Sequence, residues 1–207
     1  FPTRRSSDLY FLMALKSEII KQFGSNIKSS PDFPRLINKT FLDRIKGYLS
    51  DGEIYYGGDF DYEDLYMEPT ILTNIKSDSN IMEDEIFGPI LPVIEYLTID
   101  DAINYVNSKE KPLALYYFSE NNNTIDKVLS NVSSGGATIN DTIIHVASPN
   151  LPFGGVGLSG VGDYHGKASF DTFSHSKSVI KRGTFLELPF RFAPYKNKLS
   201  LLKKLMK

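Results

Sequence analysis

Apolar residues recur at helical spacing in the first quarter of the chain. Between residues 11 and 23 they fall at positions 11, 12, 15, 19, 20 and 23, and Gly24 ends the pattern. Asn38 is a suitable N-cap for a second helix, which places Leu42, Ile45 and Leu49 on one face and ends at residues 51–52. The pattern therefore predicts two helices, each with one apolar face.

Short apolar runs of strand length follow, and they alternate with further helical patterns. In chain order these are strands at 53–56, 66–72 and 89–96, a helix that carries Ile99, Ala102, Ile103 and Val106, a strand at 113–118, a helix at about 124–131 and a strand at 137–140. Thr98 and Asp101 form a capping box for the first of these helices. This spacing is typical of βαβ units, so it predicts an α/β fold with a mixed or parallel sheet and helices packed on it.

The last third of the chain is less regular. Glycine and proline are frequent in residues 148–166, which predicts irregular structure, and residues 178–181 are a candidate strand. Residues 194–207 set Leu199, Leu202, Leu205 and Met206 against Lys198, Lys203 and Lys204. We therefore predict a short basic amphipathic helix at the end of the chain.

The first nine residues differ from the rest. They contain two adjacent arginines and no periodicity that joins them to Tyr10. They lack the apolar or amphipathic pattern of a targeting peptide. We expect residues 1–9 to be a non-native extension fused to a truncated gene, and a native N-terminal tail is the alternative.

Composition removes several classes of function. The 23 Lys and Arg residues against 25 Asp and Glu give a net charge of −2, which does not favour nucleic-acid binding. The chain has no cysteine, so it offers no disulfide, thiolate metal site or thiol nucleophile, and its three histidines are too scattered for a metal motif. The apolar runs are shorter than a membrane span, so we expect a cytoplasmic protein, and attachment to a membrane surface through the basic terminal helix is the less favoured alternative.

Gly155, Gly157 and Gly160 satisfy the pattern G-x-G-x-x-G, which is found in dinucleotide-binding folds. That fingerprint follows a strand directly and opens a helix. Here prolines precede the glycines and further glycines follow them. We interpret the segment as an irregular loop whose backbone passes close to another part of the chain.

Four segments taken together resemble the C-terminal part of an aldehyde dehydrogenase. They read EDEIFGPILPV (83–93), EKPLALYYFS (110–119), SSGGATINDTIIHVA (133–147) and LPFGGVGLSGVGDYHGKASFDTFSHSKSV (151–179). Residues 164–167, 170–175 and 193–195 are similar to the class 3 or fatty-aldehyde branch of that family. The resemblance extends from Tyr10 to the C-terminus.

The resemblance implies roles for particular residues. In the E-x-F-G-P motif, Glu85 would hydrogen-bond the ribose next to the nicotinamide of NAD or NADP, and Phe87 would pack beside the nicotinamide ring. A substrate tunnel would be lined by Ile143, Ile144, His145 and Val146. Phe153 and the glycine loop 154–160 would be structural. At Phe41 class 3 relatives commonly carry His or a similar polar residue, so no cofactor contact is assigned there.

The family's catalytic machinery is not in this chain. Its nucleophilic cysteine, its general-base glutamate and its NAD(P)-binding domain would all precede residue 10, so no catalytic residue and no metal ligand is assigned. The resemblance implies a partial catalytic domain at 10–170, an oligomerisation segment at 171–190 and a terminal helix within 191–207. We expect the parent enzyme to be a homodimer that oxidises aldehydes to carboxylic acids and the chain alone to be inactive, while a catalytically dead interaction module is the alternative.

Overall fold

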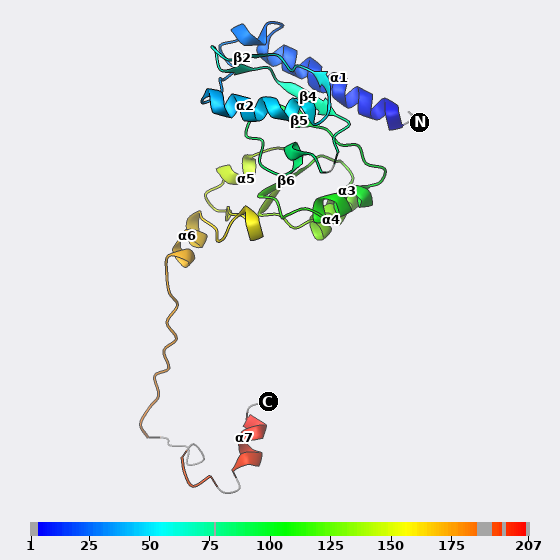
Figure 1. The fold of residues 1–207 in the computed structure, drawn as a ribbon. Coiled ribbons are helices and arrows are strands. Elements are labelled where there is room, and N and C mark those ends of the chain that lie inside the picture. Colours follow the sequence, from blue (N-terminus) through cyan, green and yellow to red (C-terminus); the bar gives the residue numbers. More distant parts are fainter. Residues whose placement is uncertain (1–3, 77, 186–191, 196–197, 206–207) are drawn as a thin grey trace. The chain divides into compact units, whose positions relative to one another are not determined.

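The computed structural model describes residues 4–76, 78–185, 192–195 and 198–205, and Figure 1 shows its elements. The chain separates into two compact units, Phe1–Ser108 and Lys109–Lys207, and each is described by itself. The sequence did not predict this boundary. Some predictions concern residues that lie outside the described ranges. These are residues 1–3 of the N-terminal extension, 186–190 of the oligomerisation segment, and 191, 196–197 and 206–207 of the terminal segment.

The first unit contains both helices predicted from the N-terminal pattern. Helix α1 spans Arg4–Phe23, and Gly24 follows it with φ +83. It begins at residue 4 and not at residue 11 as predicted, because residues 4–10 contain no proline or glycine to break it. Helix α2 spans Lys39–Gly47 and continues as a 3₁₀ turn, Tyr48–Ser50. The predicted N-cap is confirmed, because the side chain of Asn38 accepts a hydrogen bond of 2.8 Å from the backbone N–H of Phe41.

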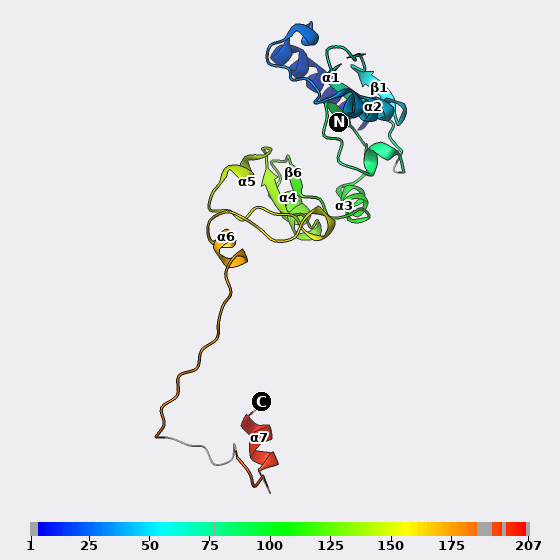
Figure 2. The ribbon, with the colours of Figure 1, turned by 60° about the vertical axis from the view of Figure 1, so that its left-hand side comes forward.

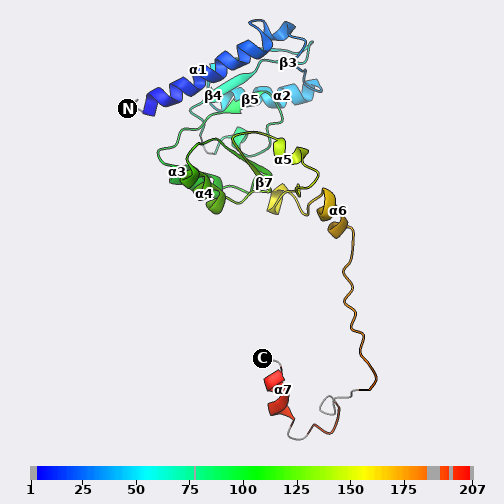
Figure 3. The ribbon, with the colours of Figure 1, turned by 180° about the vertical axis from the view of Figure 1, so that it is seen from behind.

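A three-stranded mixed sheet lies between these helices. Its order is β1 (Glu53–Tyr56), β4 (Thr70–Thr73) and β5 (Ile90–Pro92), with an antiparallel first pair and a parallel second pair. Helix α2 covers one face of the sheet and α1 the other (Figures 1 and 3). The strand predicted at 66–72 is two strands: β3 (Tyr66–Met67) pairs with β2 (Phe60–Asp61), and β4 begins after Pro69, which has no N–H for a ladder.

The core of this unit forms between α2 and the sheet. Its members are buried apolar side chains from α2, from the 3₁₀ turn that continues it, from strands β3, β4 and β5, and from the 3₁₀ turn Asn80–Met82. They are Ile45, Tyr48, Met67, Leu72, Ile81 and Ile90. Full burial of one such side chain contributes roughly 1.5–3 kcal/mol, so this cluster fixes α2 on the sheet. Helix α3 (Ile99–Asn107) closes the unit with the predicted Thr98–Asp101 capping box, whose two hydrogen bonds measure 2.7 and 3.2 Å.

The second unit is built on a βαβ motif. Strand β6 (Ala114–Tyr117) and strand β7 (Gly136–Ile139) are parallel, and helix α4 (Asn122–Asn131) connects them (Figure 2). The predicted α/β class is thereby confirmed. After β7 come the short helix α5 (Ile144–Ala147), a 3₁₀ turn (Gly157–Ser159) and helix α6 (Gly166–Thr172).

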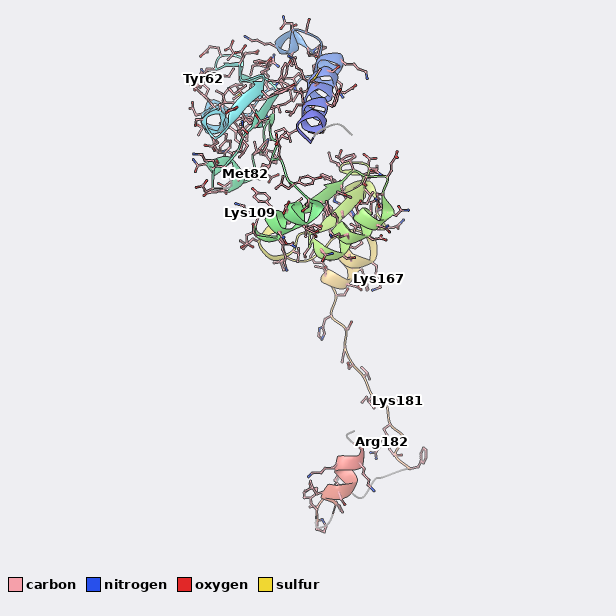
Figure 4. All side chains as sticks on the ribbon, turned by 90° about the vertical axis from the view of Figure 1, so that its right-hand side faces the viewer. Tyr62, Met82, Lys109, Lys167, Lys181 and Arg182 are labelled. Atoms are coloured by element: carbon pink, nitrogen blue, oxygen red, sulfur yellow. The ribbon has the colours of Figure 1, made fainter. Side chains whose placement is uncertain are left out.

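The candidate strand at 178–181 is not a strand in this single chain. The segment is extended and exposed, and Figure 4 labels its last residue, Lys181, and the residue after it, Arg182. A strand requires a hydrogen-bonding partner, and within the described residues none pairs with this segment. A strand that pairs with a second subunit therefore stays a prediction. The predicted terminal helix is present as α7 (Leu199–Leu205). None of the helices in the described ranges is long and apolar enough to cross a membrane.

Candidate functional site

The turn that precedes β5 exposes two side chains predicted to bind a cofactor. Glu85 is exposed, and its carboxylate makes no hydrogen bond or ion pair with any residue that the structure describes. The ring of Phe87 is also exposed, at 74% of its surface, and its backbone is left-handed with φ +51. A free carboxylate can accept hydrogen bonds from two hydroxyl groups, and an exposed ring can support a flat apolar group.

Helix α2 contacts this turn and supports it. The guanidinium of Arg44 donates hydrogen bonds to the carbonyl oxygens of Glu85, at 3.2 Å, and Ile86, at 2.7 Å. One turn earlier on the helix, Phe41 meets Phe87 edge to face, with ring centroids 6.5 Å apart. The turn is thus attached to a helix that lies about forty residues earlier in the chain.

An apolar groove of about 380 Å³ lies beside Phe87. Its walls come from residues 33–37, Phe41, Met67 and residues 87–89. Phe87 therefore forms part of a hollow that is large enough to receive a small planar group, and every wall of the groove belongs to the first unit.

The second set of predicted residues lies after β7. Ile143 and Ile144 are exposed at 63% and 55% of their surfaces, and Val146 is half-buried. Ile143 has φ +65, a left-handed conformation that is unusual for a β-branched residue. Two adjacent apolar side chains held at the surface offer contact to a hydrocarbon chain.

His145 points inward, toward the sheet of the second unit. Its Nδ1 atom shares a hydrogen bond of 3.0 Å with the hydroxyl of Thr138, and its ring lies against Tyr116 and Phe153 at centroid distances of 5.8 and 5.4 Å. Its Nε2 atom is buried and has no hydrogen-bond partner within the described residues. In this structure His145 packs helix α5 onto β7, while the two isoleucines face solvent.

The glycine loop has the structural role that the sequence suggested. A Cβ atom on Gly155 would lie 2.1 Å from the carbonyl oxygen of Ser159, and one on Gly154 would lie 2.1 Å from that of Gly162. Backbone segments therefore touch with no room for side chains. The loop leads into no long helix, so it lacks the geometry of a dinucleotide fingerprint.

The predicted site residues fall into two groups, one in each unit. Glu85 and Phe87 belong to the first unit, and residues 143–146 belong to the second. Each group contains a non-glycine residue with positive φ, namely Phe87 and Ile143. Such strained conformations are concentrated at functional sites, which supports both groups as candidates.

Two residues that shape these groups, Arg44 and Thr138, were not predicted from the sequence. Arg44 lies three residues after Phe41 and four before Tyr48, so helical spacing could have placed all three on one face of α2. For Thr138 there was no comparable pattern, because its partner His145 lies beyond the end of the strand.

Residues 10–179 match the model of the Aldehyde dehydrogenase family. The chain therefore belongs to the aldehyde dehydrogenase family, and the resemblance of its motifs is confirmed. The fold agrees: a solved structure described as the substrate-bound state of Staphylococcus aureus AldH superimposes with a TM-score of 0.82 at 46% identity, over 95% of this chain and 43% of that one.

Among individual proteins, the chain is similar to the 4,4'-diaponeurosporen-aldehyde dehydrogenase of Staphylococcus aureus, with 46% identity over 198 residues that cover 95% of the chain and 43% of the relative. It is 50% identical over 167 residues to aldehyde dehydrogenase family 3 member A2 of Mus musculus, covering 80% of the chain and 34% of that protein. A Mycobacterium tuberculosis aldehyde dehydrogenase solved with NAD+ has a TM-score of 0.67 at 25% identity, over 79% and 34% of the two chains. The chain thus spans between about a third and somewhat under half of the length of these relatives.

Proposed function

We propose that this chain forms one wall of the active site of an NAD(P)+-dependent aldehyde dehydrogenase, which oxidises aldehydes to carboxylic acids. The observation that supports the proposal is the turn at residues 85–89, in a chain that belongs to the aldehyde dehydrogenase family. The turn presents the free carboxylate of Glu85 and the exposed ring of Phe87, which lies beside an apolar groove. An interaction module without an enzymatic parent would have no need to keep Phe87 exposed in a left-handed conformation.

The residues present fit a nicotinamide cofactor, whether NAD or NADP. The carboxylate of Glu85 would accept hydrogen bonds from the hydroxyl groups of the ribose, and the ring of Phe87 would support one face of the nicotinamide. The bound cofactor would accept a hydride from the substrate carbon. The chain's own contribution is to orient the cofactor, since neither residue moves a proton or forms a bond.

The substrate would lie against the second unit. Ile143 and Ile144 would contact the hydrocarbon part of the aldehyde, and Val146 would lie behind them. His145 was predicted to line the same tunnel, and its inward orientation favours a supporting role there. An aldehyde with an apolar chain is therefore the substrate class that these residues suit.

The whole protein would be a cytoplasmic homodimer. One relative, from Rattus norvegicus, carries the name "Aldehyde dehydrogenase, dimeric NADP-preferring" and is 43% identical over 173 residues, or 84% of this chain and 38% of that protein. We assign residues 10–170 to the catalytic domain, 171–190 to the segment between subunits and 191–207 to the terminal region that contains α7. The covalent chemistry requires a thiolate, and the 207 residues contain no cysteine.

A hybrid enzyme tests the proposal. The N-terminal part of the Staphylococcus aureus relative would be joined to Tyr10 and the residues after it, and formation of NAD(P)H would be followed with aldehydes of different chain length. We expect activity in the hybrid and none in the 207-residue chain alone, because no thiol is present there to attack the aldehyde.

Glu85→Gln would then slow hydride transfer on the order of ten- to a hundredfold, because the nicotinamide would be less well oriented. Glu83→Gln is the matched control, since Glu83 is exposed in the same acidic run but lies outside the E-x-F-G-P motif. A folded hybrid without aldehyde oxidation would contradict the proposal. Equal single-turnover rates for the two variants would remove Glu85 from the cofactor site.

A further inference from the structure

We propose that Arg44 is a positioning residue, which holds the turn at residues 85–88 in the shape that presents Glu85 and Phe87. The proposal deepens the proposed function and rests on it only where it concerns the cofactor. Its structural part concerns the first unit alone.

The guanidinium group of Arg44 joins the helix to the turn at two points. Nη1 lies 3.2 Å from the carbonyl oxygen of Glu85, and Nη2 lies 2.7 Å from that of Ile86. Two donors of one planar group therefore hold two successive peptide units. Since both bonds go to the main chain, they restrain the backbone and leave the side chain of Glu85 available.

Arg44 is itself held in place by α2. Nη1 also lies 2.9 Å from the hydroxyl of Tyr48, and the guanidinium stacks on the rings of Phe41 and Tyr48 at 4.7 and 5.6 Å from their centroids. These rings lie three residues before and four residues after Arg44, on the same face of the helix and its extension. An arginine fixed in this manner loses little further side-chain freedom when it binds the turn.

The side chain of Ile86 packs against the core of the unit, and Arg44 adds hydrogen bonds to the carbonyl groups of the turn. Residues 83–85 and 87–88 are exposed, and Phe87 has a left-handed backbone that aromatic residues seldom adopt. Gly88 rests directly on α2, since a Cβ atom there would lie 2.8 Å from Cδ1 of Ile45. The contact with Ile45 thus limits how closely the turn approaches α2, and the hydrogen bonds from Arg44 orient the carbonyl groups of the turn.

Lysine cannot reproduce this arrangement. An ammonium group keeps the charge, but it has no planar fork that reaches two carbonyl groups and a hydroxyl at once. Arg44→Lys therefore removes the planar fork and keeps the positive charge, and Arg44→Met removes both. Lys46→Met is the matched control: it lies on the opposite side of α2, where its ammonium group stacks on Phe60 and Tyr62 at 4.5 and 5.3 Å from the ring centroids.

The first experiment measures cleavage of the 207-residue chain after Glu83 and Glu85 by a glutamate-specific protease. Cleavage there requires the turn to open locally, so we expect it to accelerate on the order of tenfold or more in Arg44→Lys and Arg44→Met, with cleavage after Glu53, in β1, unchanged. Lys46→Met should be cleaved at the rate of the unchanged chain. Unaltered cleavage in both Arg44 variants would overturn the proposal, as would equal acceleration at Glu53, since that would mean a general loss of stability.

The second experiment measures kinetics in the hybrid enzyme. Arg44→Lys should slow single-turnover hydride transfer about tenfold, and adding Glu85→Gln should slow it by less than the product of the two separate effects, because both changes act through one turn. Fully multiplicative effects would overturn the positioning role. An inactive hybrid would refute the proposed function and leave the proteolysis experiment to decide on Arg44.

Discussion

At the scale of single residues, Tyr66 links folding to pH. Burial and, to a smaller extent, the carboxylate of Glu68 raise the pKa of its hydroxyl to about 12, from an ordinary value of about 10. The folded chain therefore keeps a proton that the unfolded chain loses within this interval. Folding stability must fall as the pH rises from about 10 to about 12.

We expect Tyr66→Phe to flatten this part of the pH dependence, because phenylalanine has no proton to lose. Urea unfolding followed by circular dichroism at several pH values measures the effect. Tyr10→Phe, at an exposed position, is the control and should keep the slope of the unchanged chain. Parallel curves for the unchanged chain and Tyr66→Phe would contradict the assignment.

Gly136 is a second residue whose neighbours allow a sharp prediction. A Cβ atom there would lie 2.7 Å from Cδ2 of His145, whose ring is held between Tyr116 and Phe153. Gly136→Ala should therefore lower the free energy of unfolding by about 1–3 kcal/mol, and His145→Ala in the same chain should recover part of that loss. Gly47→Ala is the control, because no atom lies within 4 Å of its added Cβ. Equal stability of the two alanine variants would mean that the His145 ring is free to move.

At the scale of elements, helix α2 depends on its cap. Asn38 satisfies the N–H of Phe41, so Asn38→Ala should destabilise the first unit by about 1 kcal/mol in thermal or urea unfolding. Asn26→Ala is a suitable comparison, because Asn26 precedes the 3₁₀ turn Ile27–Ser29 without a capping bond from its side chain. A loss of the same size at Asn26 would show that the cap at Asn38 contributes nothing specific.

Elements encoded by neighbouring residues were predictable from the sequence. Asn38 and the Thr98–Asp101 box marked the beginnings of α2 and α3, because a cap and its N–H partner lie three residues apart. The contact between Arg44 and Glu85 was not predictable, since 41 residues separate the two. The orientation of His145 also depended on packing against β7, which no local pattern reveals.

Strands gave the less accurate predictions for the same reason. Tyr66 to Leu72 is continuously strand-like in composition, but Glu68 and Pro69 separate two strands that pair with different partners. Residues 178–181 have the composition of a strand, and no strand among the described residues pairs with them. A strand forms only where a second strand pairs with it, so the sequence of one segment does not determine whether that segment becomes a strand.

At the scale of the whole molecule, the extended segment after α6 favours self-association. Val179 and Ile180 are exposed at 74% and 93% of their surfaces, next to backbone groups that no described strand pairs with. Unpaired backbone and exposed apolar side chains promote association between chains. We expect the purified chain to form oligomers or aggregates, measured by light scattering during size-exclusion chromatography.

Charged substitutions identify the surface responsible. Val179→Lys together with Ile180→Lys should reduce association, because lysine at a strand edge opposes pairing. Val161→Lys, at a 99% exposed position directly after the glycine loop, is the control and should leave association unchanged. A monodisperse species of 23.3 kDa from the unaltered chain would contradict this prediction.

Phe87 has a consequence for anyone who redesigns this sequence for thermal stability. Its left-handed backbone suits glycine or asparagine better than an aromatic residue, and its exposed ring gains little from burial. A design procedure that optimises only the free energy of folding would therefore replace Phe87. If the chain has the proposed function, that replacement removes the side chain that supports the nicotinamide. A side chain that adds little to stability is here one that a search for activity should hold fixed.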